Sequence, residues 1–141
     1  MRFQDKVAVI AGAGSIRAGM GNGKATAISF AKEGARVVAI DKNLDAAKET
    51  MKIILDHGGK AIALQADVTK ASDSKDAVEA AISQYGKLDI LFNNVGIADG
   101  TRGLSVPEEE WDLVMNVNLN IAKKTLITSP PPSPPPSEGE G

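Results

Sequence analysis

The sequence contains no cysteine, and aromatic residues make up only 4% of its 141 positions. The absence of cysteine excludes a disulfide framework, a thiolate metal site and a cysteine nucleophile. Histidine and tyrosine each occur once, as His57 and Tyr85, so few side chains are available for acid–base chemistry near neutral pH. The apolar runs have the length of strands, and none is long enough to span a membrane.

The sequence also has no large excess of charge of either sign, because its 16 Lys and Arg residues nearly balance its 18 Asp and Glu residues. No basic face is evident, which argues against nucleic acid as a partner. The 43% hydrophobic and 24% charged residues are typical of a globular domain, and the length predicts one domain at most. The first apolar run begins directly after residues 1–5, which leaves no room for a signal peptide. We therefore expect a cytoplasmic domain that binds neither nucleic acid nor membrane.

The most informative segment joins Ile10 to Asp41. An apolar run over 6–11 has strand length, and a helical pattern covers 24–33; between them lie Gly12, Gly14, Gly19, Gly21 and Gly23. Glycines at such a turn let a pyrophosphate approach backbone N–H groups and the positive end of a helix. A second buried run, 37–40, ends at Asp41, whose carboxylate can accept hydrogen bonds from an adenosine ribose and would repel a 2′-phosphate. The pattern predicts a site that prefers NAD to NADP, although Asp41 could instead be a strand-end turn residue.

The glycine spacing departs from Gly-x-Gly-x-x-Gly and resembles the Gly-x-x-x-Gly-x-Gly turn of the short-chain dehydrogenase/reductase family. Gly12 corresponds to the first glycine of that turn, and Gly21-Asn22-Gly23 corresponds to its closing pair. The outer glycines are six positions apart in the family pattern and 23 − 12 = 11 apart here, so five extra residues lie within Ser15 to Met20. Arg17 falls inside this insertion and could approach a phosphate, including a 2′-phosphate, or be a solvated loop cation.

Three further motifs follow in the order of the family. Asp67-Val68 ends a third apolar run and is similar to the Asp-Val pair at the adenine ring; Asn93-Asn94-Val95-Gly96 ends a fourth and resembles Asn-Asn-Ala-Gly. Val117-Asn118-Leu119 is similar to the Val-Asn-Leu element, which makes Asn118 the counterpart of the asparagine in the catalytic tetrad. We expect no metal site. The resemblance implies a set of cofactor-binding residues, which are Gly12, Ser15, Gly21, Asn22, Gly23, Asp41, Asp67, Val68, Asn93, Asn94 and Gly96.

Strand-length runs alternate with helical patterns, which predicts an α/β fold with a parallel sheet between two helix layers. We expect the helices to end at Gly34, Gly58 and Gly86, and the apolar stripes of the second and third to include Leu55 and Ile82. The family resemblance implies a Rossmann-type, doubly wound, three-layer α/β/α sheet with strand order 3-2-1-4. A cofactor would cross the switch point between strands 1 and 4.

The composition changes abruptly near the C-terminal end. Residues 128–141 hold six of the seven prolines, together with Ser, Gly and Glu, so we expect a disordered tail outside an incomplete Rossmann domain of residues 1–127. Pro131 and Pro134 have the P-x-x-P spacing of a proline-rich ligand; a solvated tail or an out-of-frame end is the alternative.

The family's catalytic Ser and Tyr-x-x-x-Lys pair have no counterpart in these 141 residues, because Tyr85 is followed at the fourth position by Asp89. The resemblance implies hydride transfer between a nicotinamide cofactor and a carbonyl or alcohol. We expect this chain to be a catalytically incompetent nucleotide-binding fragment that would meet such a substrate only in a full-length form. Its fourth strand, left at an edge, favours self-association. The alternatives are a non-catalytic nucleotide-binding or interaction module with a Pro-rich tail, or the product of an interrupted gene.

Overall fold

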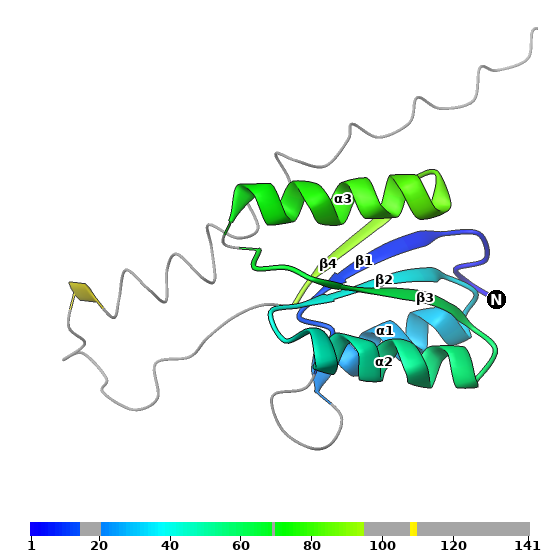
Figure 1. Cartoon of the computed structure of the whole chain (residues 1–141). Coiled ribbons are helices and arrows are strands. Elements are labelled where there is room, and N and C mark those ends of the chain that lie inside the picture. The colour runs from blue at the N-terminus through cyan, green and yellow to red at the C-terminus, as the bar shows by residue number, and fades with distance from the viewer. Residues whose placement is uncertain (15–20, 69, 95–107, 110–141) are drawn as a thin grey trace, which may run out of the picture.

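A computed structural model describes residues 1–14, 21–68, 70–94 and 108–109 of the chain. Strands and helices alternate strictly along it (Figure 1). The elements are β1 (Val7–Ala11), α1 (Asn22–Lys32), β2 (Arg36–Asp41), α2 (Leu44–Asp56), β3 (Lys60–Gln65), α3 (Ala71–Tyr85) and β4 (Ile90–Asn93). Every pair of neighbouring strands is parallel, and the order β3-β2-β1-β4 confirms the predicted Rossmann-type sheet.

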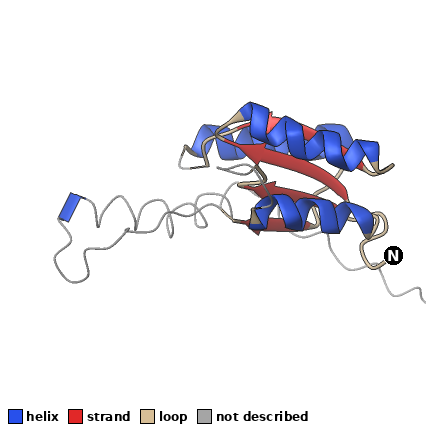
Figure 2. Ribbon diagram, turned by 90° about the horizontal axis from the view of Figure 1, so that it is seen from below, coloured by secondary structure: helices blue, strands red, loops and turns tan. Residues whose placement is uncertain are grey.

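Helices cover both faces of the sheet, with α1 and α2 on one side and α3 on the other (Figures 1 and 2). Strand β1 is buried along its whole length, as expected for a central strand of a parallel sheet covered on both faces. Its side chains alternate between two hydrophobic cores: Ala8 and Ile10 pack with Ala27 of α1, whereas Val7 and Val9 pack with Ala77 of α3.

The three predicted helix ends agree with the structure. Gly34, Gly58 and Gly86 have φ angles of +94°, +79° and +82°, a left-handed conformation that glycine adopts readily just after a helix. Two members of the predicted apolar stripes were wrong, because Leu55 and Ile82 are 47% and 39% exposed. Each follows a residue that is buried in the core, and one step along a helix turns the side chain by about 100° away from it.

Several sequence predictions lie outside the described residues. They are the insertion within Ser15 to Met20, Gly96, Asn118 and the tail of residues 128–141. In the part of the chain that the structure does describe, no helix is long and apolar enough to cross a membrane.

Candidate cofactor-binding site

The carboxyl ends of the four parallel strands meet at one edge of the sheet. Ala11, the last residue of β1, is in register with Ile40 of β2 and with Asn93 of β4, and Asp41 is in register with Gln65 of β3. The structure therefore brings to one edge the predicted cofactor residues that end or follow these strands, which are Gly12, Asp41, Asp67, Asn93 and Asn94. In open α/β sheets, ligands bind at this edge, where the strand order reverses.

The turn that follows β1 is held by backbone hydrogen bonds to both neighbouring strands. The N–H groups of Gly12 and Ala13 both donate to the carbonyl oxygen of Ile40, each at 3.0 Å. On the other side, the N–H of Asn94 donates to the carbonyl oxygen of Ala11, also at 3.0 Å. Gly12 has a φ of +74°, which turns the chain sharply out of the sheet at a point where a side chain would be strained.

The first turn of α1 packs directly onto this turn. A Cβ atom on Gly23 would overlap the carbonyl oxygen of Gly12 and would lie 2.9 Å from the Nδ2 atom of Asn94. Only glycine allows so close an approach of the helix to the chain that leaves β1. Three of the predicted residues, Gly12, Gly23 and Asn94, are thereby brought into one cluster.

The amino end of α1 suits an anionic group. Its N-cap is Gly21, which has no side chain, and the first turn, described in full, carries no acidic residue. The first N–H groups of a helix have no acceptor within the helix and carry partial positive charge. Backbone donors at such a terminus, next to glycine backbone, form the usual cradle for a pyrophosphate.

Asp41 lies beside the glycine turn and serves it structurally. Its Oδ2 atom accepts a hydrogen bond from the N–H of Gly14 at 3.0 Å, and its Oδ1 atom accepts one from the N–H of Asn43 at 2.9 Å. Asp41 is therefore a strand-end turn residue, which was the alternative that the sequence allowed. Each carboxylate oxygen has two lone pairs, so these two bonds leave acceptor capacity for a ribose hydroxyl.

Asp67 and Val68 lie beyond the end of β3 but differ in their surroundings. The carboxylate of Asp67 is partly exposed, 4.0 Å from the ammonium group of Lys42, and its N–H donates to Asp73. The Val68 side chain is buried in the core beneath α3. A cofactor could meet Asp67 through its side chain but Val68 mainly through its backbone, and both assignments stay predictions.

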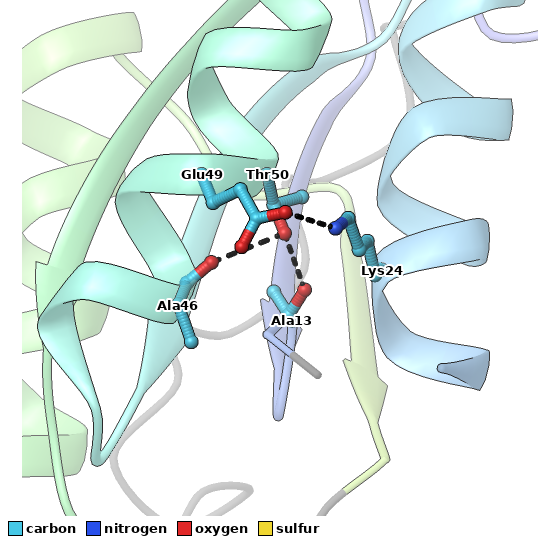
Figure 3. A network of polar contacts seen from close by, with 5 residues as sticks. All are labelled: Ala13, Lys24, Ala46, Glu49 and Thr50. Atoms are coloured by element: carbon cyan, nitrogen blue, oxygen red, sulfur yellow. Dashed lines mark hydrogen bonds and ion pairs between the residues drawn. The ribbon is translucent and has the colours of Figure 1, made fainter. Parts of the chain in front are cut away.

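Two buried polar residues near the turn were missed by the sequence reasoning (Figure 3). Thr50 of α2 is fully buried, and its hydroxyl donates to the carbonyl oxygen of Ala13 at 2.8 Å; the oxygen of Ala46 lies farther away, at 3.3 Å. Lys24 of α1 is 5% exposed and pairs with Glu49 of α2 at 2.8 Å. Two features of the sequence could have indicated these residues: Thr50 lies on the apolar stripe of α2, and Lys24 directly follows the last glycine of the turn.

Tyr85 and His57 lie at the opposite edge of the sheet. Tyr85 is the last residue of α3; burial raises its pKa, and the charge of Arg36 at the start of β2 opposes this only in part. His57 caps the end of α2, which leads to the start of β3, and its Nδ1 atom lies 2.8 Å from the carbonyl oxygen of Ile53. Among the described residues, no group of His, Asp and Glu side chains could hold a metal ion.

Fold and site together define a Rossmann-type nucleotide-binding domain, with a glycine turn at the amino end of α1 and an acid at the end of β2. A family model described as short chain dehydrogenase matches residues 6–125. The chain belongs to the short-chain dehydrogenase/reductase family, whose members use NAD or NADP.

Relatives of known identity agree with this assignment. The chain is 44% identical over 122 residues to a cyclohexanol dehydrogenase of Acinetobacter sp. (strain SE19), covering 84% of this chain and 46% of that protein. It is 39% identical over 119 residues to a 3-oxoacyl-[acyl-carrier-protein] reductase of Thermotoga maritima, with the same two coverages. A hydroxysteroid dehydrogenase structure from Escherichia coli superposes with a TM-score of 0.81 at 35% identity, over 90% of this chain and 52% of that one. The chain thus spans about half the length of these relatives.

Proposed function

We propose that this chain binds NAD through the adenosine diphosphate half of the cofactor, as the cofactor-binding part of a dehydrogenase or reductase for small alcohols or carbonyl compounds. The observation that carries the proposal is the position of Asp41 at the end of β2, with its carboxylate hydrogen-bonded to Gly14 of the glycine turn. This contact supports the proposal, because a dinucleotide needs an acceptor for its ribose next to the backbone donors that hold its pyrophosphate.

The residues at the strand ends fit the parts of such a cofactor. The backbone around Gly12 and the amino end of α1, from Gly21 to Gly23, would hold the pyrophosphate, because glycine leaves the backbone accessible there. Asp41 would accept hydrogen bonds from the adenosine ribose, and Asp67 would lie toward the adenine. Asn93 ends β4 and Asn94 follows it, so both would lie at the switch point, toward the nicotinamide half of the cofactor.

Asp41 also supports NAD over NADP. A 2′-phosphate would approach the carboxylate that accepts the N–H groups of Gly14 and Asn43. Because both of its oxygens are tied to the backbone, the side chain cannot swing aside without losing two hydrogen bonds, so charge repulsion would disfavour the phosphate.

When bound, the nicotinamide ring would accept or donate the hydride. The chain's own residues bind and orient the cofactor, and Asn118, by family resemblance, belongs to the catalytic tetrad. The other tetrad members of the family, a Ser and a Tyr-x-x-x-Lys pair, have no counterpart in these 141 residues. We propose that this chain contributes cofactor binding and no proton-transfer pair.

Calorimetric titration of the chain with NAD and with NADP tests the proposal. We expect NAD to bind more tightly, and Asp41→Ala to weaken NAD binding by about tenfold or more, since hydrogen bonds to a charged group are lost. Asp76→Ala, which removes an exposed acid from α3, is the control for net charge. Absence of NAD binding, or equal affinity in the parent and Asp41→Ala, would refute the proposal.

We also propose that the chain self-associates through β4. In the described part of the sheet, β4 pairs with β1 on one side only, and its residues are half-buried. A strand at the edge of a sheet, with apolar side chains such as Leu91 and Phe92, is prone to pair with another copy. Sedimentation velocity over a range of concentrations should show an increasing fraction of dimer or larger species. A monomer at every concentration would contradict the proposal.

A further inference from the structure

One peptide group in the glycine turn is held at both of its polar ends. The carbonyl oxygen of Ala13 and the N–H of Gly14 belong to the same planar peptide and point in opposite directions. The oxygen accepts the hydroxyl hydrogen of Thr50 at 2.8 Å, and the N–H donates to Oδ2 of Asp41 at 3.0 Å. Thr50 and Asp41 therefore clamp this peptide from its two sides.

The Thr50 contact satisfies a buried carbonyl that the sheet does not pair. Ala13 is 0% exposed and lies two residues past the end of β1, beyond the ladder between β1 and β2. A buried carbonyl without a donor costs free energy, so the Thr50 hydroxyl stabilises this one orientation of the peptide. Thr50 is itself 0% exposed and comes from α2, which places the donor firmly (Figure 3).

The space around Gly14 makes the clamp sensitive to small changes. A Cβ atom on Gly14 would lie 2.5 Å from Cβ of Ala46 and 2.9 Å from Oδ2 of Asp41. The peptide thus lies against α2 on one side and against the carboxylate on the other. A rotation of the peptide would move its N–H away from Asp41 and release that oxygen.

We propose that Thr50 is a positioning residue for cofactor specificity: it orients the Ala13–Gly14 peptide, and the peptide N–H in turn fixes the Asp41 carboxylate that distinguishes NAD from NADP. The inference rests on the proposed function, because it assumes that Asp41 faces the adenosine ribose. It adds that the preference for NAD depends on a buried hydroxyl in α2 that the cofactor does not touch.

The test is a double-mutant cycle on the ratio of NAD to NADP affinity, measured by calorimetry on the full chain. Thr50→Val keeps the side-chain volume and removes the hydroxyl, and it should lower the ratio by about threefold or more. Thr50→Ser keeps the hydroxyl and should retain the parent ratio. In the Asp41→Ala background, Thr50→Val should leave the ratio unchanged, because its effect passes through Asp41.

A stability control separates positioning from a general loss of folding. Ile54→Val removes one methylene from a 2% exposed core residue one turn farther along α2, and it should destabilise the chain without changing the ratio. Should Thr50→Val fail to fold, Gly14→Ala approaches the same carboxylate from the peptide side and should lower the ratio likewise.

Each outcome decides a different claim. A parent that binds neither dinucleotide overturns both the proposed function and this inference. A parent that prefers NAD, with an unchanged preference in Thr50→Val or in its substitute Gly14→Ala, overturns the inference alone. A Thr50→Val effect on the ratio that is equally large in the parent and in the Asp41→Ala background also overturns it, because Thr50 would then act independently of the carboxylate.

Discussion

Gly23 of α1 lies so close to Gly12 that a methyl group on Gly23 would overlap the carbonyl oxygen of Gly12. Because the obstructing atom is backbone at the end of a buried strand, it cannot move aside cheaply. We expect Gly23→Ala to lower the free energy of unfolding by about 3 kcal/mol, as measured by urea denaturation. Gly86→Ala is the control: its φ of +82° is strained for alanine, but nothing lies within 4 Å, so its cost should be smaller, about 1 kcal/mol. Equal costs would contradict the overlap.

Asp89 joins the start of β4 to the start of β1. Its Oδ2 atom accepts the N–H of Val7 at 2.9 Å and lies 3.0 Å from Nζ of Lys87. Burial alone would raise the pKa of Asp89, but the Val7 hydrogen bond and the Lys87 ammonium together outweigh burial and hold the pKa below its ordinary value of 3.8.

A depressed folded-state pKa gives a defined pH dependence. The Asp89 carboxylate contributes stability that is fully present above the unfolded-state pKa and is lost as the pH falls through the lowered folded-state pKa. Asp89→Asn should therefore cost about 1 kcal/mol near neutral pH, with the difference from the parent closing in acid below the ordinary pKa. Urea denaturation over a pH series measures this, with Asp76→Asn as control. A difference that does not change with pH would count against it.

The ion pair between Lys24 and Glu49 is asymmetric. The Lys24 side chain is 6% exposed, whereas that of Glu49 is 66% exposed. Glu49→Gln leaves a buried ammonium without its carboxylate and should cost about 1–2 kcal/mol. Lys24→Met fills similar space without charge and leaves Glu49 in water, so it should cost less.

Chemical denaturation of both variants checks this order. Glu79→Gln breaks the exposed pair of Glu79 with Lys75 on α3 and should change stability by no more than about 0.5 kcal/mol. A larger loss of unfolding free energy in Lys24→Met than in Glu49→Gln would contradict this order, because Lys24 would then stabilise the fold by more than its ion pair with Glu49.

The 141-residue chain should show no turnover of alcohols with NAD or of ketones with NADH. Its one tyrosine, Tyr85, lies at the edge of the sheet opposite the glycine turn, and burial raises its pKa, whereas proton transfer near neutral pH needs a lowered one. Absorbance of NADH in a purified sample of verified mass measures the rate, with Tyr85→Phe as a matched variant. Any cofactor-dependent turnover in the parent would contradict the prediction, and its loss in Tyr85→Phe would show that Tyr85 supplies the proton.

Much of the fold could be predicted because its signals are local. The apolar runs that became β1 and β2 are buried on both faces and therefore read as continuous hydrophobic segments. The strand order followed from the family resemblance rather than from periodicity. Helix α1 begins at Asn22, two residues before the helical pattern, because the glycines at its start carry no periodic signal.

The contacts around the site could not be predicted in the same way, because they join residues far apart in the chain. Thr50 is 37 positions from Ala13, and Asp41 is 27 positions from Gly14. The sequence allowed Asp41 to be a ribose-binding acid or a turn residue, and only its contacts with the N–H groups of Gly14 and Asn43 show that it serves the turn. Leu55 and Ile82 failed for a related reason: an apolar stripe is wider than the face that the sheet covers.

The clamp at Gly14 and the contact of Gly23 with Gly12 fix the chain at two points on either side of residues 15–20. The entropy of closing a loop between two fixed points grows only with the logarithm of its length, and doubling the length costs about 0.6 kcal/mol. We therefore expect the five extra residues that the family resemblance implies at this position to cost little free energy of folding. We expect insertions of other lengths between Gly14 and Gly21 to leave the stability of the sheet nearly unchanged, which would make this position suitable for grafting a short peptide.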